Sequence, residues 1–266
     1  MYSKFQLSLR YIQYWLRSSN SKGHGVHSPF VFSFITDVLN DKGSYYCYQP
    51  IESLRAALQQ DNTELEIADF GAGSRVNSSK RRKVSSIASS ALKPAKYSQL
   101  MFRMVNYYQP AIVLELGTSL GITSSYLASG NPAAKVITME GAPAIATVAR
   151  NNFASLRLAN ISLVEGNFDE TLPGTLAKLP APVDFAFVDG NHRYQPTMDY
   201  FNQLLAVSHD HTIIILDDIH WSSEMEQVWE EVKQHPAVTM TIDLFFIGIV
   251  LMRKEFKIKQ HFSVRF

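Results

Sequence analysis

The chain has 266 residues, and its 25 lysines and arginines nearly balance its 24 aspartates and glutamates. That length suits one large domain or a main domain with an appendage, and the balanced charge gives no global field that favours nucleic acid or an acidic lipid surface as a partner. The single cysteine, Cys47, excludes an internal disulfide framework, and no apolar run approaches the ~20 residues of a membrane span.

The N-terminal segment, residues 4–17, has the spacing of an amphipathic helix. Its apolar stripe consists of Phe5, Leu9, Ile12 and Leu16, widened by Tyr11, Tyr14 and Trp15. Because the polar face is not strongly basic, we expect the helix to pack on its own protein or on the second chain of a homodimer rather than on a membrane surface. Lys4 and Arg10 interrupt the segment, unlike a secretory signal, so a cytoplasmic protein is expected.

A second helix is predicted from Pro29 to about Leu39, because Ser28 can cap it and proline suits the first helical position. His24 and His27 lie on the glycine loop before it, where contacts to backbone or substrate are favoured over metal binding. Further helices are expected at 51–58 and 97–108.

Residues 66–74, EIADFGAGS, imitate a nucleotide-binding turn, with an apolar run, an acid and two glycines. The sequence that follows, SRVNSSKRRKVSSIASS, is polar, basic and serine-rich, so no apolar helix completes the unit. We therefore expect a loop that exposes Arg75 and residues 80–83. The alternative is a lid or an anion-binding element over an active site.

The stretch VLELGTSLGITSSYLASG, Val113 to Gly130, has the pattern of a strand, a tight turn and a helix. An apolar run ends at Glu115, and the turn 117–121 leads into helical apolar spacing. Glycines allow a nucleotide-like ligand to approach the backbone, and the start of the helix presents unpaired N–H groups. The turn is a candidate ligand cradle.

From this stretch on, strands and helices alternate regularly, which predicts an α/β fold with a doubly wound, mostly parallel sheet. Further strands are expected at 135–140, 161–165, 183–189 and 212–218, and helices from Pro143, over 194–207, and after a capping box of Ser223 and Glu226.

Two strand-like runs, 238–242 and 246–252, are separated by only three residues and must form an antiparallel hairpin, which brings the sheet to seven strands. We divide the chain into a helical N-terminal extension (1–94), a main domain (95–254) and a basic tail (255–266) that is flexible or serves for docking.

Polar or acidic residues end the predicted parallel strands, where ligands bind in sheets of this kind. They are Glu115, Glu140, Asn167, Asp189, Asp217 and Asp218. Glu140 closes the second strand, where a carboxylate can accept both hydroxyls of a ribose. A dinucleotide or S-adenosylmethionine fits this pattern. The terminal hairpin and the acid before the glycine turn favour the methyl donor.

The segments ELGTSLG, VITMEG, LVEGNF, VDFAFVDGNH and IIILDDIHW, in this order, resemble the successive motifs of class I S-adenosylmethionine-dependent methyltransferases. The resemblance covers about residues 95–254 and implies a Rossmann-like fold. Within that superfamily the chain is most similar to the small metal-dependent O-methyltransferases of the catechol, caffeoyl-coenzyme A and macrolide-sugar types.

The resemblance implies a set of cofactor-binding residues. They are Glu115, Gly117, Thr118, Gly121, Glu140, Gly141, Asn167, Phe168 and Asp189. The residues from 115 to 121 would hold the methionine moiety, Glu140 the ribose, and Asn167 with Phe168 the adenine. Ser119 stands where many relatives have glycine, so the turn geometry is expected to differ slightly.

Asp189, Asp217 and Asp218 follow neighbouring predicted strands and can converge as hard oxygen ligands for Mg²⁺ or a similar cation. His192 lies three residues past Asp189, where the similar catechol-type enzymes carry a basic lysine, and we propose it, with Asp189, as a catalytic residue and general base. The other interpretation leaves these acids as cofactor, capping or loop residues and His192 as a surface side chain.

We therefore predict a methyltransferase that moves a methyl group to a hydroxyl oxygen of a small molecule, with residues 1–94 capping the acceptor site. The alternatives are a metal-independent enzyme that methylates nitrogen or a macromolecule, a nicotinamide-dependent oxidoreductase, and a binding protein that keeps the fold without turnover. The cofactor that raises the melting temperature discriminates between the methyl donor and the dinucleotide.

Overall fold

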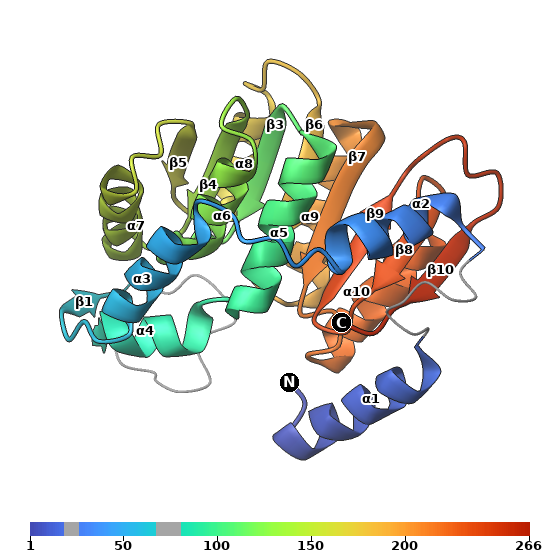
Figure 1. Ribbon diagram of the computed structural model, residues 1–266, viewed down its shortest axis with the longest axis horizontal. Helices are drawn as coiled ribbons and strands as arrows, with labels where there is room; N and C mark the ends of the chain where they lie inside the picture. Colours follow the sequence, from blue (N-terminus) through green and yellow to red (C-terminus); the bar gives the residue numbers. More distant parts are fainter. Residues whose placement is uncertain (19–26, 68–80) are drawn as a thin grey trace. The chain divides into compact units, whose positions relative to one another are not determined.

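The computed structural model describes residues 1–18, 27–67 and 81–266 of the chain (Figure 1). Two compact units are present: one combines residues 1–41 with 182–266, and the other comprises residues 42–181. The division at residues 94 and 254 stays a prediction. The predictions for His24, Arg75, Lys80 and the glycines of EIADFGAGS concern residues outside the described ranges.

The unit of residues 42–181 contains a run of three parallel strands, ordered β3-β4-β5. The strands are β3 (Ile112–Leu116), β4 (Lys135–Glu140) and β5 (Ile161–Glu165). The helices that precede, connect and follow them are α5 (Ala95–Tyr108), α6 (Ile122–Gly130), α7 (Pro143–Ser155) and α8 (Phe168–Leu176). Every residue of β3 is buried, as expected of a parallel strand covered on both faces. The expected strands and most helices of this region are confirmed, whereas α8 was missed because Pro173 and Gly174 interrupt its pattern.

The same unit begins with α3 (Tyr48–Leu58), a short antiparallel pair of β1 (Glu64–Glu66) with β2 (Arg81–Lys83), and α4 (Val84–Ala91). The expectation of a loop through this region was wrong for residues 81–91. Three buried residues, Val84, Ile87 and Ala88, form the inner face of α4. Because serines separate these apolar residues, the helical spacing was not recognised in the sequence.

The other unit contains five strands in the order β10-β8-β9-β7-β6. They are β6 (Val183–Val188), β7 (Ser208–Asp217), β8 (Met240–Asp243), β9 (Ile247–Leu251) and β10 (Gln260–Ser263). β6 and β7 are parallel, and β8 and β9 form the antiparallel hairpin that the short connection required. The mixed, mostly parallel α/β class is confirmed, with eight strands in β3–β10 where seven were expected.

The additional strand is β10, which pairs in parallel with β8. Of the two expectations for the tail, a flexible or a docking segment, the flexible one was therefore wrong for residues 260–263. The next residue, Val264, is fully buried. The basic residues of the segment 255–266 drew attention to its charge, so its half-buried edge strand was not predicted.

Helices of this unit follow the expected pattern. They are α1 (Lys4–Arg17), α2 (Pro29–Ser33), the π-helical segment η1 (Phe34–Leu39), α9 (Tyr194–Ala206) and α10 (Ser223–Gln234). Ser28 caps α2 by accepting a hydrogen bond from the backbone N–H of Val31. The capping box predicted from Ser223 was wrong, because Ser222 is the N-cap of α10 and accepts from the N–H of Met225 at 3.2 Å.

Candidate functional site

The turn after β3 adopts the backbone conformation that its glycines permit. Gly117 and Gly121 have φ angles of 106° and 81°, and Ser119 has a φ of 49°. The N–H groups of Gly117 and Thr118 both donate to the carbonyl of Met139, each at 3.0 Å. Ser119 therefore takes the left-handed conformation that a glycine would adopt at this position, and the turn is fastened to strand β4.

Gly121 is required by packing as well as by its backbone. A Cβ atom at this position would lie 2.5 Å from Cε1 of Phe153 and 3.3 Å from Cβ of Ala149, both on α7. Gly121 is the N-cap of α6. The start of α6 thus lies closer to α7 than any side chain would allow, which keeps the turn compact.

Glu140, the last residue of β4, is half-buried and uses both carboxylate oxygens. Oε2 accepts from the N–H of Ser119 and Oε1 from the N–H of Ala142, each at 2.9 Å. An ionised carboxylate has about four acceptor positions, so this one side chain can accept from both turns at once. Gly141 follows directly at the strand end.

Glu115 lies within β3 and is fully buried. Its Oε2 accepts hydrogen bonds from the hydroxyls of Thr138, at 2.6 Å, and Ser124, and the Thr118 and Thr138 hydroxyls are 2.5 Å apart. This network links Thr118 of the turn to strands β3 and β4. The sequence reasoning missed Ser124 and Thr138, although Thr138 lies in a strand position where an apolar residue is expected.

Asn167 and Phe168 lie where β5 passes into α8. The Asn167 side chain accepts from the N–H of Asp169 at 3.2 Å and caps α8, and Phe168 is the first, half-buried residue of that helix. Gly166, with a φ of 128°, donates its N–H to the Glu140 carbonyl at 3.0 Å. The structure therefore brings the predicted adenine residues beside the strand that ends in Glu140.

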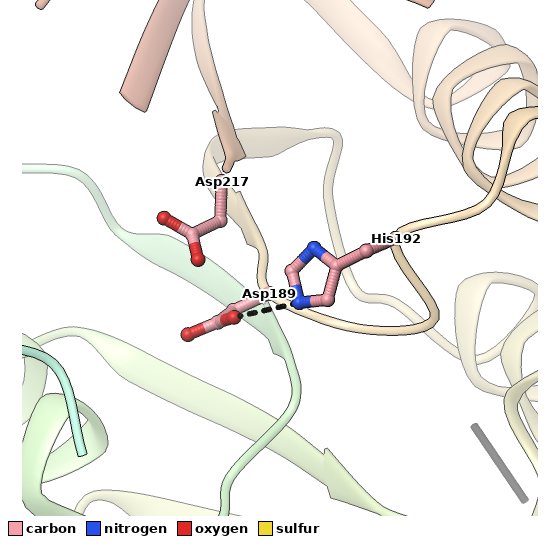
Figure 2. Close-up of side chains that lie close together, drawn as sticks. All are labelled: Asp189, His192 and Asp217. Atoms are coloured by element: carbon pink, nitrogen blue, oxygen red, sulfur yellow. Dashed lines mark ion pairs between the residues drawn. The ribbon is translucent and has the colours of Figure 1, made fainter. Parts of the chain in front are cut away.

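In the other unit, Asp189, His192 and Asp217 converge (Figure 2). Asp189 follows β6 and Asp217 ends β7, and these strands pair in parallel with Val188 opposite Leu216. One ligand atom from each of the three side chains lies within 4.8 Å of the others. Nε2 of His192 is 3.4 Å from Oδ1 of Asp189, the contact drawn as a dashed line in Figure 2.

The loop after β6 turns back on itself and brings the His192 side chain close to Asp189. Asn191 and His192 have left-handed φ angles of 67° and 43°, and the His192 N–H donates to the Gly190 carbonyl at 2.9 Å. Asp218 does not belong to the cluster; its backbone has a φ of 53° and its N–H donates to the Phe246 carbonyl at 2.6 Å. The predicted group of three ligands thus has His192 in place of Asp218.

Two carboxylates and one imidazole fit a divalent cation. Carboxylate oxygens suit Mg²⁺, Ca²⁺ and Mn²⁺, and a neutral imidazole nitrogen is a good ligand for first-row transition metals. Asp217 is 1% exposed, so cation binding would offset the cost of placing its charge in the protein interior.

Through the described ranges, no helix is both long enough and apolar enough to cross a membrane. This observation agrees with the lack of long apolar runs in the sequence.

Residues 114–219 match the sequence model of a family described as a methyltransferase domain. The O-methyltransferase imqG of Aspergillus flavus is 30% identical over 119 residues, which are 43% of this chain and 47% of the relative. The chain therefore spans about half the length of the curated relative that it matches.

Solved structures share the fold. The O-methyltransferase TomG of Streptomyces achromogenes, involved in tomaymycin synthesis and solved with SAM, is 22% identical at a TM-score of 0.53 and covers 62% of this chain and 82% of its own. A Bacillus cereus O-methyltransferase in complex with SAH is 20% identical at a TM-score of 0.56, and the match covers 84% of this chain and 97% of the other. The SAH-bound Podospora anserina methyltransferase PaMTH1 is 13% identical at a TM-score of 0.59, and the match covers 96% of this chain and 98% of the other.

Proposed function

We propose that this chain, whose residues 114–219 form a methyltransferase domain, is an S-adenosylmethionine-dependent methyltransferase that acts on a hydroxyl oxygen of a small molecule. The observation that carries the proposal is the left-handed turn 117–121 held by the carboxylate of Glu140. This turn lies in the segment that matches the methyltransferase family.

S-adenosylmethionine supplies an activated methyl group on its sulfonium sulfur. In the proposal, Glu140, which ends β4 and accepts the Ser119 N–H of the turn, also accepts the ribose hydroxyls. The residues from 115 to 121 hold the methionine moiety, Glu115, Gly117, Thr118 and Gly121 among them, and buried Glu115 also supports the turn by accepting from the Thr138 hydroxyl. Gly141, Asn167 and Phe168 line the remainder, and the predicted contact of Asp189 with the cofactor is part of the same proposal.

Asp189, His192 and Asp217 would hold a divalent cation. When bound, such a cation lowers the pKa of an acceptor hydroxyl, which otherwise stays protonated near neutral pH. The short distance between His192 and Asp189 favours His192 as a third ligand, and its role as general base stays a prediction. Asp218 would support the end of β7 through its backbone.

The acceptor is proposed to be a small hydroxylated molecule, with residues 1–94 shaping its pocket, because no basic surface dominates the composition. A metal-independent enzyme that methylates nitrogen or a macromolecule is the second candidate. The methyltransferase domain match disfavours the nicotinamide-dependent oxidoreductase.

The test is a pair of measurements on the full chain. Calorimetry should detect binding of S-adenosylmethionine or its demethylated product and no binding of a nicotinamide dinucleotide. A panel of catechols, hydroxycinnamoyl esters and sugars with a labelled methyl donor should then yield a methyl ether, and excess chelator should abolish the product. Preferential dinucleotide binding would refute the methyltransferase, and full activity in chelator would refute the metal.

A further inference from the structure

Among the described residues, helix α1 contacts its own unit through the face that carries Tyr14 and Arg10. Tyr14 is buried, and its hydroxyl donates to the carbonyl of Val264. Arg10 pairs with Glu226 on α10 at 2.8 Å, and the Tyr2 hydroxyl donates to the same carboxylate at 2.7 Å. This polar and aromatic face fixes the orientation of the helix.

The opposite face of α1 exposes its large apolar side chains. The exposed fractions are 72% for Phe5, 45% for Leu9, 53% for Ile12 and 73% for Leu16. These residues are spaced by four, three and four positions, so they form one continuous apolar stripe along the helix. The apolar stripe that the sequence predicts to pack on protein is therefore the outward face of the helix.

We propose that this stripe is the interface between two copies of the chain, formed by α1 against the α1 of the second copy. The residues that flank the stripe on the helix surface are uncharged: Gln6 and Gln13 on one side, Ser8 on the other. Lys4 and Arg17 lie further round the helix, so they do not oppose a second copy.

A membrane surface fits this helix less well. Interfacial helices carry lysine and arginine along the polar face beside the apolar stripe, where the side chains reach lipid headgroups. In α1 the polar face is instead engaged by its own protein, since Arg10 is bound to Glu226.

The exposed surface is large enough for a weak dimer. Met1 and Trp15, exposed by 60% and 43%, extend the stripe at its edge. With each of six large side chains contributing on the order of 100 Å², two copies would bury about 1,200 Å² of side-chain surface, near the lower bound of specific interfaces.

The two helices are proposed to run antiparallel, because helix dipoles then compensate each other. A two-fold axis at the middle of the stripe places Leu9 of one chain against the partner's Ile12, and Phe5 against the partner's Leu16. A parallel pair would instead place each residue against its own copy.

Sedimentation of the full chain tests the interface. The wild-type chain should be dimeric at tens of micromolar, and Leu9→Glu should raise the dissociation constant by more than about tenfold, because it places a charge in an apolar interface. Ile258→Lys is the matched control, since Ile258 is 76% exposed but lies outside α1, and it should leave the dimer intact. A monomeric wild-type chain, or a dimer unaffected by Leu9→Glu, would overturn the proposal.

A mixing experiment separates loss of the interface from loss of the helix. Leu9→Glu and Ile12→Lys should each be monomeric alone, but an equimolar mixture should form a heterodimer in which the glutamate faces the lysine. Only the antiparallel arrangement pairs these two positions. If the mixture stays monomeric, the antiparallel interface is refuted.

Vesicle flotation tests whether the apolar stripe of α1 binds a membrane surface instead of a second chain. The wild-type chain should remain in solution with vesicles of four parts phosphatidylcholine to one part phosphatidylglycerol. Flotation that Leu9→Glu abolishes, together with a monomeric chain in solution, would assign the stripe to a membrane surface and overturn the dimer. The inference and its tests do not depend on methyl transfer.

Discussion

The carboxylate of Glu140 accepts a hydrogen bond from the backbone N–H of Ser119 at 2.9 Å, so the end of strand β4 fixes the turn that follows strand β3. The same carboxylate accepts from the N–H of Ala142, also at 2.9 Å. One side chain thereby orders two turns that follow neighbouring strands. Glu140 is thus both a structural residue and the candidate ribose acceptor.

Replacing Glu140 by alanine should weaken the binding of S-adenosylmethionine roughly thirtyfold, because a charge-assisted pair of hydrogen bonds contributes on the order of 2 kcal/mol. Isothermal calorimetry measures the change. Asp69→Ala, in the other glycine-bearing segment, is the control and should bind normally. Unchanged affinity in Glu140→Ala would refute the ribose assignment, and an equal loss in Asp69→Ala would move the cofactor to the segment 66–74.

Ser119→Gly should leave the free energy of unfolding unchanged or raise it by up to about 1 kcal/mol, because glycine adopts a left-handed φ without the steric cost that a side chain incurs. The Ser119 hydroxyl is buried and has no hydrogen-bond partner within the described part of the chain, so removing it breaks no bond there. Ser119→Val is the matched variant and should lose more than about 1 kcal/mol, since a β-branched residue at a φ of 49° is strained. Urea denaturation of both variants measures the difference, and equal stabilities would show that the turn tolerates any residue.

Gly121→Ala should destabilise the protein by about 1–3 kcal/mol, because the new Cβ would lie 2.5 Å from Phe153 and the backbone φ is +81°. Gly174→Ala provides the contrast: a Cβ at this position on helix α8 meets nothing within 4 Å. Alanine in a helix should stabilise by about 0.5–1 kcal/mol. Thermal and urea unfolding measure the change in the free energy of unfolding for both variants. A stable Gly121→Ala variant would mean that α6 and α7 separate at little cost.

Asp217→Asn should weaken the binding of Mn²⁺ or Mg²⁺ at least tenfold, because it removes one of the two carboxylates in the cluster. Asp218→Asn alters a neighbouring acid outside the cluster and should change metal affinity far less. Calorimetric titration with the metal alone measures both, with no need for the acceptor. An equal loss in the two variants would restore the ligand set of Asp189, Asp217 and Asp218 that the sequence suggests.

The Cys47 thiol should resist alkylation in the native protein. Burial raises the pKa of this thiol from its ordinary value of 9.0 to about 11, so little thiolate exists at neutral pH. A pKa raised in the folded state contributes stability below pH 9 that is lost as the pH rises from about 9 towards 11, because the unfolded chain releases its proton first. Iodoacetamide should label Cys47 only in denaturant. Rapid labelling of the native chain would contradict the burial.

The regular alternation of strands and helices could be predicted from the sequence because short, mostly apolar runs alternate with segments of helical spacing. The runs KVITME and ISLVE coincide with β4, which is largely buried, and with β5, which is only partly buried. The hairpin was equally determined, since three connecting residues cannot form a crossover helix. Where polar residues interrupt the pattern, in α4, α8 and β10, the sequence alone misled, because burial there depends on neighbours that come from distant parts of the chain.

The candidate site residues were selected as polar residues at the ends of parallel strands, a choice that follows from the fold itself, and their roles stay predictions. Their grouping was decided by tertiary structure. The choice of His192 over Asp218 depends on two left-handed residues, Asn191 and His192, that reverse the loop after β6. Likewise, the period of α1 reveals an apolar stripe, but only the packing of Tyr14 and Arg10 shows that the stripe faces outward. A sequence period identifies which residues share a face, whereas long-range contacts determine what that face meets.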